Sequence, residues 1–289
     1  MVAIPRRRSR AAGASASDPL PRAGAPGRVG AESAAPAPRT DDAPELVLFE
    51  GGGVAAHTGV VQLVVSPRRV ARAFGAFVAL LVAAHVMVQI VGRARADEQV
   101  MGLLPLLNVG TERNLPTFYS ACAMLVCSGL LLLIARLEWS RPRGVGLYWA
   151  VLAAVFCGLA CDEMLVLHEK LIAPVRNLLG TSGALYYAWV IPYGAFALAF
   201  AGAYSRFLSR LPRRSALLFV LSGAVFVSGA LVLEMLGAAW IESYGHGVGY
   251  VAFQTVEEAF EMSGIVLFIF SLLDYIGREH ELQLRFAAS

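Results

Sequence analysis

The sequence predicts an all-α, polytopic integral membrane protein with six transmembrane helices and a disordered N-terminal tail. Of its 289 residues, 57% are hydrophobic and 16% are charged, whereas soluble domains carry about 25% charged residues. Six apolar segments follow one another along the chain, each close to the roughly 20 residues that a helix needs to cross a bilayer. This composition predicts membrane lipids as partners and argues against nucleic-acid binding.

The composition divides the chain into four regions. Residues 1–43 are rich in Ala, Pro, Gly, Ser and Arg and carry too little apolar surface to offset the entropy of ordering, which predicts a disordered tail. Residues 44–69 are expected to form a linker or interfacial segment, with a weak hairpin pattern at 45–65. The transmembrane domain is predicted at 70–275, with spans at 72–92, 115–135, 146–168, 184–205, 215–238 and 250–273, followed by a cytoplasmic C-terminal tail at 276–289.

The basic residues are distributed unequally between the two sides of the predicted spans. One side carries twelve arginines: Arg68, Arg69, Arg72, Arg136, Arg141, Arg143, Arg206, Arg210, Arg213, Arg214, Arg278 and Arg285. The other side carries Arg93, Arg95, Arg113, Lys170 and Arg176. Since Lys and Arg accumulate in cytoplasmic loops, both termini are predicted to be cytoplasmic.

A polar stretch, Cys161 to Glu169, lies at the outer end of the third predicted span. At 100° per residue, Cys161, Asp162, His168 and Glu169 share one arc of about 120°, and Glu163 points elsewhere. Ionisable groups at a bilayer boundary persist mostly when they are paired, hydrated or functional. The stretch therefore predicts a site.

The predicted topology brings further polar residues to the same outer side. Glu234 lies near the outer end of the fifth span, and three acids lie on one face of the sixth. The catalytic candidates are Asp162, His168, Glu169, Glu258 and Glu261. The metal-ligand candidates are Asp162, His168, Glu169, Glu234, Glu258 and Glu261, with Arg113, Asn114 and Glu257 around them.

Other polar or reactive residues have simpler interpretations. His85 is interpreted as a packing histidine with satisfied hydrogen bonds. The four cysteines are interpreted as small apolar residues, with a redox pair between Cys122 and Cys161 as the alternative. Pro192 is expected to kink the fourth span.

Three motifs together resemble a group of uncharacterised bacterial multipass membrane proteins. They are Asn114-Leu115-Pro116-Thr117-Phe118-Tyr119-Ser120, then Asp162-Glu163 followed by His168-Glu169, and Glu257-Glu258-x-x-Glu261-Met262-x-Gly264. The resemblance covers roughly residues 70–275. It implies residence in a bacterial cytoplasmic (inner) membrane and a common role for the three motifs, and it implies no activity.

Three classes of function remain open. In the first, the outward-facing carboxylates and imidazole bind a divalent metal (Zn²⁺, Mn²⁺, Fe²⁺ or Mg²⁺) that activates water against a lipid or lipid-linked substrate. In the second, the acids belong to a proton- or cation-coupled transporter. In the third, they form a structural ion network or bind a partner membrane subunit. The sequence contains no Glu-x-x-His or His-Glu-x-x-His motif, so its metal signal rests on composition alone.

Overall fold

Helices are the only regular elements in the described part of the chain, which comprises residues 65–95, 99–141 and 144–280 of a computed structural model. The all-α prediction is confirmed for these residues. The tail at 1–43 and the hairpin pattern at 45–64 lie outside the described residues, as does most of the predicted C-terminal tail.

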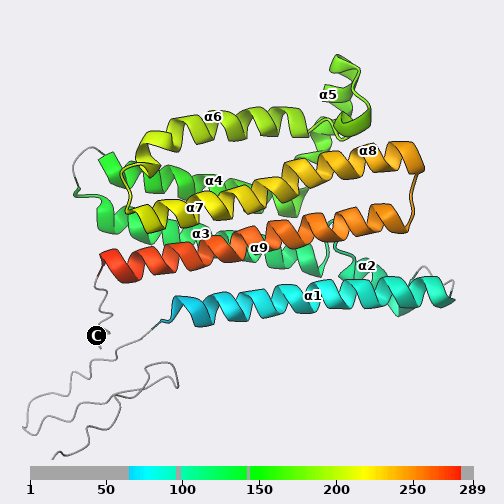
Figure 1. The fold of residues 1–289 in the computed structure, drawn as a ribbon, viewed down its shortest axis with the longest axis horizontal. Helices are drawn as coiled ribbons and strands as arrows, with labels where there is room; N and C mark the ends of the chain where they lie inside the picture. Colours follow the sequence, from blue (N-terminus) through cyan, green and yellow to red (C-terminus); the bar gives the residue numbers. More distant parts are fainter. Residues whose placement is uncertain (1–64, 96–98, 142–143, 281–289) are drawn as a thin grey trace, which may run out of the picture. The chain divides into compact units, whose positions relative to one another are not determined.

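Six long helical stretches correspond in order to the six predicted spans (Figure 1). They are α1 (Pro67–Arg95), α3 (Leu115–Glu138), α4 (Val145–Leu165), α6 (Val190–Leu208), the continuous stretch α7 (Arg213–Val227), η5 (Ser228–Leu233) and α8 (Glu234–Tyr244), and α9 (Val248–Glu279). Short helices lie in the connections: η1 (Val100–Gly102), α2 (Leu103–Leu107), η3 (Glu169–Leu171), α5 (Ile172–Leu179) and η4 (Gly183–Leu185). Five of the long stretches, all but α6, are long and apolar enough to cross a membrane, so the sixth span stays a prediction.

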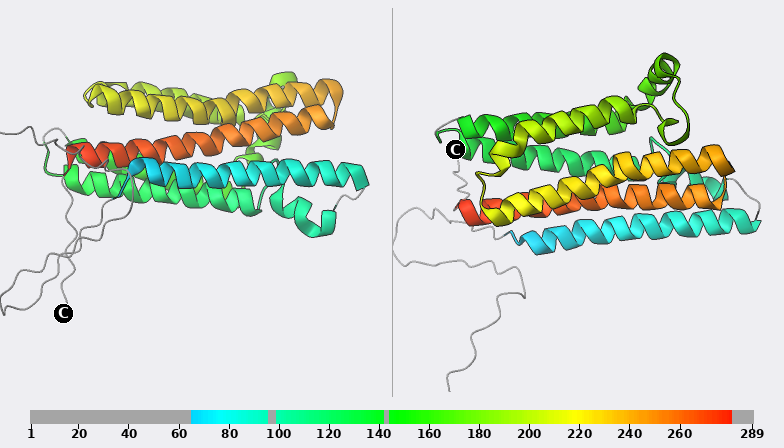
Figure 2. Two further views of the ribbon diagram at one scale, coloured as in Figure 1. Left: turned by 60° about the horizontal axis from the view of Figure 1, so that its bottom comes forward. Right: turned by 45° about the horizontal axis from the view of Figure 1, so that its top comes forward.

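Helix α9 occupies the centre of the bundle. It contacts α1, α3, α7 and α8, while α3 packs along α4. Figures 1 and 2 show the long helices running roughly parallel or antiparallel to one another, with α9 between α1 and the α7–α8 stretch. The apolar residues of α9 from Met262 to Ile276 are mostly buried, so this helix supplies much of the core.

The core is centred on Trp149 of α4, whose side chain is 0% exposed. Its ring centroid lies 5.0 Å from those of Phe207 in α6 and Tyr275 in α9, and 5.7 Å from that of Phe219 in α7. Aromatic pairs at such separations contribute packing energy in addition to their buried area. Trp149 therefore joins four helices near the start of α4.

Three local features differ from the sequence predictions. Helix α4 ends at Leu165, because Val166 adopts a left-handed conformation (φ 54°, ψ 50°), whereas the third span was predicted to continue to residue 168. Pro192 lies in the first turn of α6, where its missing N–H would have no helical partner anyway, so the predicted mid-span kink is wrong. The fifth stretch contains a π-helical segment, Ser228–Leu233, which no sequence pattern indicated.

The helix directions give the bundle two chemically different ends (Figure 1). One end holds the start of α1, α4 and α7 and the finish of α3, α6 and α9, where the described arginines of the larger predicted group lie. The opposite end holds the end of α4, the start of α3 and the junction of α8 with α9. The candidate acids lie toward this second end.

Candidate functional site

The acids of α8 and α9 lie beside a close approach of the α7–η5 stretch to α9. A Cβ atom on Gly229 would lie 2.7 Å from Glu261 Cγ and 2.9 Å from the Glu257 carbonyl oxygen, and one on Gly264 would lie 2.7 Å from the Phe226 backbone nitrogen. The absence of a side chain at both glycines therefore permits the close approach. The π-helical segment follows Val227 directly, and such segments occur frequently at functional sites.

The carboxyl groups of Glu234 and Glu257 lie within hydrogen-bonding range of each other. The indole Nε1–H of Trp189 also donates to Glu234 Oε1 over 3.1 Å. A carboxylate has acceptors only, so two carboxyl groups can hydrogen-bond directly only when at least one of them carries a proton. A proton shared by these two carboxyl groups would satisfy the pair.

Glu258 and Glu261 of α9 lie close to this pair in the sequence, and we call the four glutamates Glu234, Glu257, Glu258 and Glu261 the acidic cluster. Glu258 and Glu261 both lie within electrostatic range of Glu163 on α4 and of Glu112, which precedes α3. Glu163 was predicted to point away from the site, whereas it lies within electrostatic range of the other acids. The cause is the early end of α4, since the predicted helical arc assumed a helix through Glu169.

A tight turn after α4 brings Asp162 and His168 together. Asp162 Oδ1 accepts the backbone N–H of His168 over 2.8 Å, and Asp162 Oδ2 lies 3.3 Å from His168 Nδ1. The other ring nitrogen, Nε2, lies 3.9 Å from Glu112 Oε1, and the imidazole packs against Trp189 with 4.8 Å between ring centroids. His168 is therefore oriented by a chain reversal and not by the helical face that the sequence predicted.

Glu112 and Asn114 owe their positions to the start of α3. The Asn114 side chain accepts the Thr117 backbone N–H over 3.2 Å and donates to the Asn108 carbonyl over 2.6 Å. This is an N-cap, with Pro116 near the first helical position, as is typical of helix starts. The first of the three motifs thus has a structural explanation, and it presents Glu112, which the sequence analysis did not include, to His168.

The remaining predicted site residues lie farther from these contacts. Glu169 and Lys170 are exposed and, with Glu112, Arg113 and Val166, line a surface pocket of about 390 Å³. Arg113 is exposed and forms no ion pair with another described residue, so it does not compensate the charge of the acids.

His85 is buried and fully hydrogen-bonded. Its Nδ1 accepts the Val109 backbone N–H over 3.2 Å, and its Nε2 lies 3.1 Å from Thr255 Oγ1. Because the Thr255 hydroxyl donates to the Val251 carbonyl, Nε2 must carry the hydrogen, and His85 is the neutral Nε2–H tautomer. This is the packing role that the sequence predicted.

The described residues contain no group of three His, Cys, Asp or Glu side chains that could hold a metal ion. The structure therefore does not support a single metal centre built from the six predicted ligands. Asp162 and His168 meet at one place, and Glu234 meets Glu257 at another. Within the described chain, His168 is the only basic side chain in an ion pair with any of these acids, so uncompensated carboxylates must bind protons or cations.

Glu112, which precedes α3, and His168, which follows α4, have shifted pKa values. Burial raises the pKa of Glu112, and the nearby Glu169 raises it further, although His168 partly opposes this shift. Burial lowers the pKa of His168, but its hydrogen bond to Asp162 and the charges of Asp162, Glu112 and Glu163 outweigh this effect and raise the pKa above its ordinary value. The imidazole is thereby favoured in its charged form.

Replacing Asp162 by asparagine should remove a pH-dependent part of the stability. A histidine with a raised pKa in the folded state stabilises the protein fully below its unfolded pKa of about 6.5, and this contribution is lost as pH rises through the folded-state value. We expect the variant to unfold more easily at low pH, by about 1.5–3 kcal/mol for the loss of a charged hydrogen-bond partner. The melting temperature measured from acidic to alkaline pH tests this.

His246→Gln is the control, because His246 is an exposed histidine that contacts the Tyr250 ring. It should retain the pH dependence of the unchanged protein. A pH profile that is identical in Asp162→Asn and the unchanged protein would contradict the proposed role of the Asp162–His168 pair.

Comparison with known proteins gives a family and no activity. A family model described as "Domain of unknown function (DUF8692)" matches residues 73–276. This range contains every acid of the site and agrees with a family of uncharacterised proteins. No curated protein and no solved structure matches the chain.

Proposed function

Because the chain belongs to the DUF8692 family, whose description assigns no activity, we propose its function from the geometry: it is a multipass membrane protein that binds and releases protons at an acidic cluster. The observation that carries this proposal is the proximity of the Glu234 and Glu257 carboxyl groups, which have no basic side chain paired with them among the described residues. Two carboxyl groups so close can share a hydrogen bond only when one of them carries a proton. Glu258 and Glu261 supply further acceptors beside it.

The proposed proton site is reached from one side of the membrane. Glu112 and Glu169 lie at the edge of the acidic cluster and line the surface pocket. Toward the other end of α9, the next buried contact between two polar side chains in the described structure is that of Tyr275 with Glu138, fourteen residues or about 21 Å beyond Glu261. The buried α9 residues between these points are mainly apolar, which favours proton binding over proton conduction through the bundle.

We place this membrane protein in the bacterial cytoplasmic membrane, with both termini and the arginine-bearing end in the cytoplasm. The proposal rests on the arginine bias, which the helix directions preserve at each connection. The acidic cluster then faces the periplasm. Protonation would therefore follow the external pH.

Catalysis on a lipid-linked substrate is a second candidate, favoured by the Asp162–His168 pair. A carboxylate that orients an imidazole is a common arrangement for general acid–base chemistry. However, His168 does not itself line the surface pocket. Its closest link to the pocket is Glu112, whose Oε1 lies 3.9 Å from His168 Nε2. We therefore rank catalysis below proton binding.

Infrared spectroscopy of the Glu257→Gln variant tests the proton site directly. The unchanged protein should show the carbonyl band of a protonated carboxyl group, shifted in D₂O, and the variant should lose the part that arises from about one proton per chain. Glu242→Gln is the matched control, since Glu242 is exposed and accepts a hydrogen bond from the Gly183 backbone. Its spectrum should keep the band.

An unchanged band in Glu257→Gln would refute the shared proton. Elemental analysis of the same preparations tests the remaining hypothesis, which is that the acids bind a metal ion. Near-stoichiometric metal, with a melting temperature that falls in EDTA and is restored by the ion, would replace proton binding by metal binding at these acids.

A further inference from the structure

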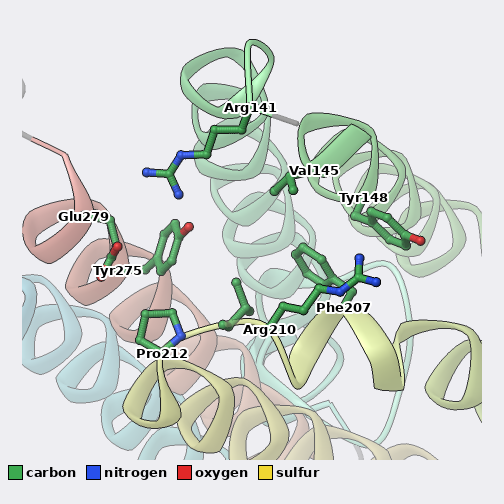
Figure 3. A pocket seen from close by; sticks show the side chains of 9 residues that line it. Arg141, Val145, Tyr148, Phe207, Arg210, Pro212, Tyr275 and Glu279 are labelled. Carbon is green, nitrogen blue, oxygen red and sulfur yellow. The ribbon is translucent and has the colours of Figure 1, made fainter. Parts of the chain in front are cut away.

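A pocket of about 420 Å³ lies at the arginine-bearing end of the bundle and takes no part in the proposed proton site (Figure 3). Arg141, from the turn after α3, and Arg210, from the α6–α7 connection, lie on its two sides. Tyr148, Phe207 and Tyr275 supply aromatic walls. The pocket thus combines two guanidinium groups with an apolar surface.

The two arginines differ in how they are held. Arg141 Nε lies 3.0 Å from Glu138 Oε2, and Glu138 is fully buried, with the Tyr275 hydroxyl donating to its other oxygen over 3.0 Å. This contact fixes Arg141 through Nε and leaves its terminal nitrogens directed over the pocket (Figure 3). Arg210 forms no side-chain hydrogen bond or ion pair with another described residue, so its five donors are uncommitted.

Guanidinium groups bind phosphate by paired hydrogen bonds more effectively than most other side chains. The pocket also lies where the long helices end, which is the depth of lipid headgroups in a bilayer. We propose that this pocket binds a phosphate-bearing ligand, with the phosphate between Arg141 and Arg210 and an apolar portion against the aromatic walls.

A single acid in the described lining limits which phosphates fit. Glu279 faces the pocket beside Tyr275 (Figure 3), and its negative charge repels ligands that carry several negative charges. Since Arg141 is also paired with Glu138, a phosphodiester with one negative charge suits this lining better than a polyphosphate does. Two sources share this chemistry: the headgroup of a membrane phospholipid and a soluble phosphate compound.

Binding measurements with the full-length protein in uncharged detergent distinguish the two sources. Short-chain phosphatidylglycerol, the diacylglycerol with the same chains and inorganic phosphate are titrated separately, and binding is followed by calorimetry. Phosphatidylglycerol should bind and diacylglycerol should not. Arg210→Gln should weaken phosphatidylglycerol binding about tenfold, the effect expected for the loss of one charge-assisted contact.

Arg206→Gln is the matched control, because Arg206 is an exposed arginine in the last turn of α6 and does not line the pocket. It should bind phosphatidylglycerol as the unchanged protein does. Saturable binding of inorganic phosphate that Arg210→Gln also weakens would support the pocket with a soluble ligand. Equal losses in Arg206→Gln and Arg210→Gln, or no binding of either phosphate compound, would overturn the proposal. Equal melting temperatures of the ligand-free proteins establish that the variants are folded.

Discussion

Replacing Trp149 by alanine should reduce the free energy of unfolding by about 3–5 kcal/mol, the usual range for deleting a buried tryptophan. The indole is 0% exposed and contacts Phe207, Phe219 and Tyr275 from three other helices. Its loss removes dispersion contacts that lipid cannot restore inside the bundle. Thermal and denaturant unfolding in detergent, followed by circular dichroism, measure the effect.

Trp149→Phe is the control for the loss of aromatic packing. The indole Nε1 is buried and has no hydrogen-bond partner in the described structure, so phenylalanine removes an unsatisfied donor while it keeps an aromatic ring. We expect a much smaller loss of stability than for alanine. Similar losses of stability in the two variants would show that a phenylalanine ring is too small to replace the packing of the indole.

The long helices could be predicted from the sequence because each is a long apolar run. The residues at which the helices end were harder to predict, and α4 illustrates the reason. Met164-Leu165-Val166-Leu167 continues the apolar pattern without a glycine or proline, yet Val166 is left-handed. A β-branched residue rarely adopts that conformation, so no local signal marked the reversal that pairs Asp162 with His168.

The same error explains which site residues were misplaced. The helical arc assigned Glu163 to the outside because the arc included His168 and Glu169, which lie beyond the end of α4 at Leu165. Glu163 lies instead within electrostatic range of Glu258 and Glu261. Glu112 could have been found from its neighbours, since Asn114 and Pro116 form a helix-start signal and the residues before a helix lie beside its first turn. The direct contact between Glu234 and Glu257 depends on the π-helical segment and on two glycines, and neither feature is visible in hydropathy.

Replacing Gly229 by alanine should destabilise the bundle and disturb its acidic cluster at once. The new Cβ would lie 2.9 Å from the Glu257 carbonyl oxygen and 3.0 Å from the Glu261 backbone nitrogen. Neither atom belongs to a flexible side chain, so α9 itself must shift. Overpacking of this kind costs about 1–3 kcal/mol, and the shift should move the carboxyl groups of Glu234 and Glu257 apart.

Gly223→Ala provides the matched comparison, since a Cβ at Gly223 in α7 would meet nothing within 4 Å. Alanine is the better helix former, so this variant should be unchanged or stabilised by up to about 1 kcal/mol. Unfolding and the infrared carboxyl band are measured on both variants. The close approach of η5 to α9 is the physical basis of the proton site only if Gly229→Ala loses stability and alters the band while Gly223→Ala does neither. A Gly229→Ala protein with unchanged stability and an unchanged band would separate the proton site from the helix contact proposed to create it.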